Sequence, residues 1–145
     1  MATGYEADFY AWSHEQAALL RAGRLDAVDI DHLAEEIESM GRAEKRELVN
    51  RLVVLILHLL KWRFQPALRG NRWRLGVEEQ RYRLADYLDD SPSLKARLPE
   101  AIRDAHRLAL VDAERETGLA RETFPVLCPW SFEQMIAASF WPDQD

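Results

Sequence analysis

The chain has 145 residues, of which 48% are hydrophobic and 30% are charged, a balance typical of one soluble globular domain with a sizeable core. An aromatic content of 10% argues against intrinsic disorder, and the formal net charge of −6 disfavours nonspecific nucleic-acid binding by the whole surface. The single cysteine, Cys128, excludes an intrachain disulfide and a multi-cysteine zinc site.

The first residues and the longest apolar run do not resemble a targeting or membrane segment. The stretch MATGYEADFYAWSHEQ is acidic and aromatic, unlike a secretion signal. The longest apolar run, Leu52–Leu60, has nine residues including His58, whereas a membrane-spanning helix needs about 20. We therefore expect a cytoplasmic protein of bacterial type without a membrane partner.

Apolar residues recur with helical spacing along nearly the whole chain, and no period-two alternation predicts strands. The first predicted helix has an apolar stripe and ends at Gly23. Its stripe consists of Tyr5, Phe9, Trp12, Leu19 and Leu20. A short second helix has Asp29 as its N-cap and an apolar face within residues 30–40, and Gly41 permits a break after it.

Residues 42–65 predict a long third helix of about 36 Å, which ends there because the residue before Pro66 avoids the helical region. Later helices have start signals at Asn71, at Ser91 followed by Pro92, and at a capping box of Ser131 and Gln134. Pro99 is expected to divide or kink the fifth helix. The fold prediction is an all-α, single-domain helical bundle over residues 1–145, with five or six helices and a long central helix (about 42–65).

The third predicted helix is apolar on about three sides and has one narrow polar stripe. On a helical wheel, the stripe contains Glu47, Arg51, Val54, His58, Lys61 and Gln65. Such a stripe is most simply a narrow solvent-facing surface, or it is hydrogen-bonded to neighbouring helices. The alternative is an internal groove, where His58 would act as acid, base or ligand and Arg51 would hold a phosphate or carboxylate.

Several sequence motifs together resemble one bacterial protein family. They are DFYAW, LAEEIESMGRAEKREL, HLLKWRFQP, SPSLK, ETG and FPVLCPW, and they are distributed over nearly the whole chain. The family that they resemble is the bacterial domain of unknown function number 29. The resemblance implies a small all-helical domain that makes up most of the chain, and it carries no activity, cofactor or catalytic residue.

Arg51 and His58 also resemble the Arg-x4–6-His motif of the HEPN superfamily, whose small all-α domains include RNA-cleaving toxins of toxin–antitoxin pairs. In such a site, a histidine acts as acid or base and an arginine stabilises the phosphate. The candidate catalytic residues are therefore Arg51, His58 and Lys61. The residue after the motif's arginine is usually polar, whereas here it is Leu52, and two residues at this spacing often occur by chance.

Metal-binding motifs are absent from the sequence: it contains no HExxH, no repeated Glu-x-x-His and no cluster of Cys and His. Glu36 and His58 are isolated candidates for metal ligands, and no cofactor is expected. The acids around Glu36 are expected to form a solvated face. The other histidines, His14, His32 and His106, are expected in surface or capping roles.

Charge is unevenly distributed, because residues 1–40 have a net charge of −7 and residues 61–83 have a net charge of +5. The basic segment mixes cations with aromatic rings, as nucleic-acid-binding surfaces do. Its candidate binding residues are Lys61, Arg63, Arg69, Arg72, Trp73 and Arg74. The cations could instead pair with the acidic first forty residues and the rings could lie in the core, so nucleic acid is the less favoured partner.

The favoured function is a non-enzymatic protein-interaction module that binds an unknown protein partner or forms a homo-oligomer. The aromatic N-terminal helix or the C-terminal FWP segment would carry the interface, with Trp12 and Trp141 as anchors if they are exposed. The alternative is a HEPN-like RNA-cleaving or nucleic-acid-binding protein of a toxin–antitoxin type pair that uses Arg51 and His58.

Overall fold

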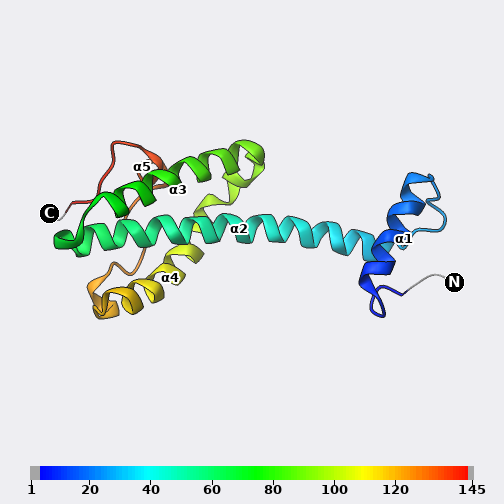
Figure 1. Cartoon of the computed structure of the whole chain (residues 1–145), viewed down its shortest axis with the longest axis horizontal. Coiled ribbons are helices and arrows are strands. Elements are labelled where there is room, and N and C mark those ends of the chain that lie inside the picture. Colours follow the sequence, from blue (N-terminus) through cyan, green and yellow to red (C-terminus); the bar gives the residue numbers. More distant parts are fainter. Residues whose placement is uncertain (1–3, 144–145) are drawn as a thin grey trace. The chain divides into compact units, whose positions relative to one another are not determined.

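Every regular element between residues 4 and 143, the part of the chain that the structure describes, is helical, which confirms the all-α prediction. The structure is a computed structural model (Figure 1). Within the described range, the α-helices are α1 (Phe9–Arg21), α2 (Ile30–Phe64), α3 (Asn71–Asp90), α4 (Leu98–Thr117) and α5 (Phe132–Ile136). Short 3₁₀-helices are η1 (Pro66–Leu68), η2 (Pro92–Arg97) and η3 (Arg121–Thr123). None of the helices in this range is both long enough and apolar enough to cross a membrane.

The chain divides into two compact units, Met1–Ala43 and Glu44–Asp145. The first unit contains α1 and the first part of α2, and the second contains the remainder of α2 with all later helices. The expectation of one domain over residues 1–145 stays a prediction, because compactness alone does not show whether a unit folds independently.

In the first unit, hydrogen bonds to Asp29 fix α1 against the start of α2. Asp8 caps α1 by accepting a hydrogen bond from a backbone N–H of the first turn at 3.1 Å, and Gly23, with φ of +71°, follows the end of the helix. The Trp12 indole N–H donates to the Asp29 carboxylate at 3.1 Å, and Gln16 accepts from the Asp29 backbone N–H at 2.7 Å. The predicted end of the first helix near Gly23 is confirmed.

The predicted second and third helices are one helix, α2, so the break expected at Gly41 is wrong. Asp29 caps this helix as expected, because its carboxylate accepts from the backbone N–H of His32 at 3.4 Å. One glycine costs a helix only about 1 kcal/mol relative to alanine, and good helix formers surround Gly41 in the stretch EEIESMGRAEK. The long helix therefore begins at Ile30 rather than near residue 42, and it ends at Phe64, one residue before the predicted end.

In the second unit, α3 and α4 flank the second part of α2 (Figure 1). The core has large apolar members at Leu48, Leu52, Leu55, Ile56, Leu59, Leu60, Val77, Leu84, Leu88, Phe124, Trp130 and Met135. Every fourth residue of α4 contributes a fully buried alanine, namely Ala101, Ala105, Ala109 and Ala113. These small side chains let the α4 backbone approach the core closely. Pro99 lies in the first turn of α4, after η2, which confirms the predicted division of the fifth helix.

Candidate functional site

A strip of large apolar side chains is exposed in the first unit. Ile30, Ile37 and Met40 lie on α2 and are 65%, 63% and 61% exposed. Ile30 and Ile37 are seven residues apart, which places them two turns apart on one face, and Met40 lies beside Ile37 on the next turn. We call these three residues the N-terminal apolar strip. Leu25, in the loop before α2, is equally exposed.

Acidic side chains border the N-terminal apolar strip. On the wheel of α2, the exposed Asp31 and Glu38 lie at about 100° and 80° from Ile30. The first unit contains nine carboxylates and three arginines, a net charge of −6. The second unit contains sixteen acidic and sixteen basic residues and is neutral. The strip therefore lies in the unit that carries the net charge of the whole chain.

The interior of the first unit is small. Among its described residues, only Trp12 and Gln16 are buried, and Trp12 is 2% exposed. The Trp12 ring packs edge-on against Tyr5 and His32, and its N–H is bonded to Asp29. Trp12 is therefore not available as an exposed anchor.

Two pairs of titratable side chains are hydrogen-bonded in the first unit. The Tyr5 hydroxyl donates to Glu36, and this bond is the largest cause that raises the pKa of Tyr5 to about 12. His32 Nδ1 lies 2.7 Å from Asp29 Oδ2, which raises the pKa of His32 and lowers that of Asp29. Glu36 is thus engaged by Tyr5, and the described residues contain no group of three His, Cys, Asp or Glu side chains placed to hold a metal ion.

The polar stripe of α2 lies against α3. Arg51 pairs with Glu47 at 3.1 Å, and its guanidinium lies 5.4 Å from the ring centre of Tyr87 on α3. The Tyr87 hydroxyl donates to Glu44 Oε2 at 2.7 Å, and burial together with this bond raises the pKa of Tyr87 to about 12. Arg51 Nε is buried without a hydrogen-bond partner. Arg51 is thus held between Glu47 and Tyr87.

His58 and Lys61 extend this interface. His58 Nδ1–H donates to the carbonyl oxygen one turn earlier at 2.7 Å, and its Nε2 would lie 3.2 Å from a Cβ at Gly76 of α3. Lys61 pairs with Glu116 of α4 at 3.3 Å and lies 5.8 Å from the ring centre of Trp73. The three candidate catalytic residues therefore lie where helices pack, and none of them lines the cavities at α3, at α4 or between α2 and α4. This arrangement favours a stripe bonded to neighbouring helices over an internal groove.

Part of the basic-aromatic segment is engaged in intramolecular contacts. Arg69 donates from Nε to the Trp62 carbonyl oxygen at 2.7 Å, lies 5.1 Å from the Trp62 ring centre and pairs with Asp143 at 3.4 Å. Arg63 lies 5.0 Å from the ring centre of Phe64. The acids that pair with the candidate binding residues, at positions 116 and 143, belong to the second unit rather than to the acidic first forty residues.

The remaining candidates of the basic segment lie at the start of α3. Arg72 and Arg74 are exposed, whereas Trp73 between them is half-buried. Arg74 contacts the Asn71 side chain at 3.4 Å. Among the candidate binding residues, Arg72 and Arg74 are thus the exposed cations, while Lys61 and Arg69 are engaged in ion pairs.

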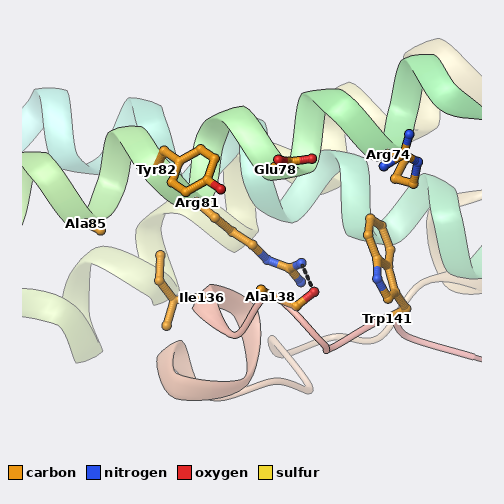
Figure 2. Close-up of a pocket in the computed structure, with 8 residues that line it drawn as sticks. All are labelled: Arg74, Glu78, Arg81, Tyr82, Ala85, Ile136, Ala138 and Trp141. Carbon is orange, nitrogen blue, oxygen red and sulfur yellow. Dashed lines mark hydrogen bonds between the residues drawn. The ribbon is translucent and has the colours of Figure 1, made fainter.

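A cavity of about 470 Å³ lies between α3 and the C-terminal segment (Figure 2). On the α3 side it is lined by Arg81, Tyr82 and Ala85, and on the other side by Ile136, Ala138 and Trp141. Figure 2 shows the Arg81 side chain reaching from α3 to the Ala138 carbonyl group. We call this space the Arg81 cavity.

Arg81 holds the C-terminal segment in place. It is 6% exposed and donates hydrogen bonds to the carbonyl oxygens of Met135 (2.7 Å), Ala138 (3.4 Å) and Phe140 (2.6 Å). Its guanidinium also lies 5.1 Å from the ring centre of Trp141, which is half-buried. Arg81 therefore ties three carbonyl groups of the C-terminal segment to α3.

Residues 4–141 match the model of a protein family that is described as Domain of unknown function DUF29. The chain belongs to this family. The match reaches into both compact units of the DUF29 chain, and it confirms the family resemblance of the sequence motifs. No curated protein and no solved structure matches the chain.

The sequence-based predictions do not identify two buried polar residues of this DUF29 chain, Arg81 and His106. Arg81 occupies a core position of α3 in register with the buried Val77 and Leu84, so an arginine within an apolar stripe is the signal that could identify it. His106 is 3% exposed, its Nε2 is buried without a partner, and burial lowers its pKa. The expectation of a surface or capping role for His106 is therefore wrong.

Proposed function

We propose that this DUF29 chain is a non-enzymatic protein-interaction module whose N-terminal apolar strip docks on a partner protein. The observation that carries the proposal is the exposure of Ile30, Ile37 and Met40, between 61% and 65%, within three turns of one helix. Grouped apolar side chains at the surface mark interaction sites, whereas single ones do not. The cytoplasmic location expected from the sequence is compatible with this role.

The limited interior of the first unit supports the proposal. Units of about 40 residues rarely fold alone without a disulfide, a metal or a partner, and this unit spans Met1–Ala43. The sole cysteine, Cys128, lies outside it. Among its described residues, Trp12 is the only buried apolar one. A partner that covers the strip would supply apolar contacts that the unit lacks.

Charge indicates the chemistry of the partner. The first unit has a net charge of −6, and the exposed carboxylates of Asp31 and Glu38 border the strip. Two copies of the chain would bring together units of the same charge, which disfavours self-association through this face. We therefore propose a different protein, with an apolar groove and a basic rim, as the occupant. This is the helix-in-groove mode, in which apolar residues one and two turns apart insert together.

The test compares a strip variant with a matched control. Ile30→Ser/Ile37→Ser removes two exposed apolar side chains from the strip, and Val126→Ser/Leu127→Ser removes two from the second unit, where they are also highly exposed. Proteins captured by each form are identified, purified and titrated by calorimetry. We expect a partner that binds the control like the unchanged chain, binds the strip variant at least about tenfold more weakly, and loses affinity as salt rises.

Light scattering determines whether the occupant is a second copy. If the unchanged chain and the control form a dimer and the strip variant does not, the occupant of the strip is a second copy of the chain and not a different, basic protein. Partners that bind the strip variant and the unchanged chain equally well would overturn the proposal.

A further inference from the structure

The Arg81 cavity has the size and lining of a small-molecule site. Its volume of about 470 Å³ lies within the range of about 300 to 1,000 Å³ that is usual for ligand pockets. Tyr82, Ile136 and Trp141 supply apolar and aromatic surface, and Ala85 and Ala138 leave space between them. A ligand with a flat apolar body would therefore find contacts on two opposite walls, one from α3 and one from the C-terminal segment (Figure 2).

The buried cation of this cavity has no anionic partner within the described residues. Arg81 makes no ion pair there, and its hydrogen bonds go to three neutral carbonyl groups. A buried positive charge without a negative partner is costly, and the loss of water lowers the pKa of the Arg81 guanidinium while leaving it protonated. An anion that enters the cavity would offset this cost.

The guanidinium also retains donors for such an anion. It has five N–H groups, and the three bonds to carbonyl oxygens use one on each nitrogen, which leaves one N–H on each terminal nitrogen. Arg74 adds a second positive charge at the cavity wall, where its contact is with the neutral Asn71. Glu78, the one carboxylate among the residues that line the cavity, pairs with neither arginine, so the lining has a net positive charge.

We infer that the Arg81 cavity binds a small molecule that carries a carboxylate on a flat apolar body. The carboxylate lies at the nearly buried Arg81 guanidinium, where charge-assisted hydrogen bonds form. The apolar body lies between Trp141 and the α3 wall. This site belongs to the second unit and is independent of the proposed role of the N-terminal apolar strip.

The first experiment titrates the full chain with two matched pairs of probes, phenylacetate with phenylacetamide and indole-3-acetate with indole-3-acetamide. Each pair keeps the ring and removes the negative charge. Binding is followed by calorimetry and by amide NMR shifts. We expect both carboxylates to bind at least about tenfold more tightly than their amides, since a hydrogen bond to a charged group exceeds a neutral one by this factor. Equal affinity of acid and amide would overturn the inference.

The second experiment locates the site without disturbing the buried arginine. Ala85→Trp fills the cavity from an exposed position of α3, and Ala96→Trp adds the same ring at an exposed position of η2 away from it. We expect Ala85→Trp to weaken carboxylate binding at least about tenfold and Ala96→Trp to leave it unchanged. Unchanged binding in Ala85→Trp, or no binding of either carboxylate to the unchanged chain at about 5 mM, would overturn the inference.

Substitution of Arg74, which lines the Arg81 cavity, provides a third measurement. Arg74→Gln removes the second cation from the cavity wall, and Arg72→Gln removes an exposed cation two residues away that does not line it. We expect a few-fold loss of carboxylate affinity in Arg74→Gln and no loss in Arg72→Gln. Equal losses in both variants would indicate nonspecific attraction by the basic segment and would contradict a defined site.

Discussion

The imidazole of His58 lies against Gly76 of α3. A hydrogen bond holds one side of the ring, and the backbone of α3 lies close to the other side. On one side, its Nδ1–H is bonded to the Val54 carbonyl oxygen at 2.7 Å. On the other, a Cβ at Gly76 would lie 3.2 Å from Nε2 and 3.3 Å from Cδ2 of the ring. The ring therefore fills the space that an alanine side chain at position 76 would take, and α2 and α3 pack through a histidine and a glycine.

Gly76→Ala tests this contact. Alanine normally stabilises a helix interior by about 1 kcal/mol relative to glycine. At position 76 the contact with the His58 ring should cancel that gain, so we expect the free energy of unfolding in urea to stay unchanged or to fall. In a His58→Ala background, the same substitution should stabilise by about 1 kcal/mol. A coupling below about 0.3 kcal/mol between the two positions would contradict the prediction.

His58→Ala also tests the alternative function in RNA cleavage. Because the His58 ring is engaged between α2 and α3, we expect the purified unchanged chain and His58→Ala to show the same background of RNA cleavage. Gel assays on single-stranded RNA provide the measurement, with Arg51→Gln in parallel. Cleavage by the unchanged chain that disappears in both variants would support the HEPN-like alternative.

The pair of His32 and Asp29 makes the first unit sensitive to pH. The hydrogen bond to Asp29 raises the pKa of His32, burial opposes this, and the charges of Asp29, Glu35 and Glu6 reinforce it. A raised histidine pKa contributes stability that is complete below about pH 6.5 and is lost as pH rises through the folded-state value. The lowered pKa of Asp29 contributes stability that is lost as pH falls below about 4. The pair is therefore most stabilising between about pH 4 and 6.5.

Two measurements check this pH dependence. An NMR titration should give His32 a pKa above its usual value of about 6.5. Amides of the first unit, corrected for intrinsic exchange rates, should be less protected at pH 8 than at pH 6. His32→Gln should remove that difference, and His14→Gln, in an exposed histidine of α1, should preserve it. A difference that persists in His32→Gln would contradict the prediction.

At the scale of elements, α2 shows which features of the fold sequence reasoning could predict. The end at Phe64, the cap at Asp29 and the polar stripe all follow from local chemistry or from helical periodicity. The break at Gly41 does not occur, because whether a glycine interrupts a helix depends on the energy of the turns around it. The wheel places Arg51 and His58 in one stripe, but which helix covers the stripe depends on tertiary packing.

Substitutions at Gly41 test the continuity of α2. No atom lies within 4 Å of a Cβ at this position, apart from the neighbouring backbone of the helix. Gly41→Ala should therefore raise helix content slightly and stabilise the local helix by about 1 kcal/mol. Gly41→Pro should cost about 3 kcal/mol or more locally, because it removes a hydrogen bond and clashes with the preceding turn. Circular dichroism and hydrogen exchange of residues 30–45 provide the measurements, and equal exchange in both variants would contradict a continuous helix.

The candidate sites were predictable to different degrees. In the N-terminal apolar strip, Ile30 and Ile37 are visible in the sequence as one face of a helix. Such a pattern predicts that the face is buried within the chain. The structure instead leaves both side chains exposed. Periodicity alone cannot distinguish a face that packs internally from one that awaits a partner. The Arg81 cavity joins α3 to residues more than fifty positions later, and no local pattern predicts that contact.

At the scale of the whole molecule, the two units differ in both charge and interior. The unit Met1–Ala43 has all of the net charge and buries Trp12 and Gln16 among its described residues. The unit Glu44–Asp145 is neutral and has an extensive apolar core. Since apolar burial is the main stabilising contribution to folding, the first unit should be the less stable of the two.

Native-state hydrogen exchange tests this difference. Amides of α1 and of residues 30–40 should open with a lower free energy than buried amides of α3 and α4. A partner that covers the N-terminal apolar strip should raise the protection of the first unit and leave the second unit unchanged. One common opening free energy for both units in the free chain would contradict this expectation.

The Arg81 contacts also bear on the order in which the chain folds during its synthesis. The N-terminal apolar strip is complete once residue 40 has been made, but the second unit needs Met135 for its core and Phe140 as a partner of Arg81. At translation rates of about 5 to 20 residues per second, roughly 5 to 20 s separate these two events. During this interval the strip is already present while Arg81 still lacks the carbonyl groups that it will bind. A partner near the ribosome would therefore meet the nascent strip before the rest of the chain has folded.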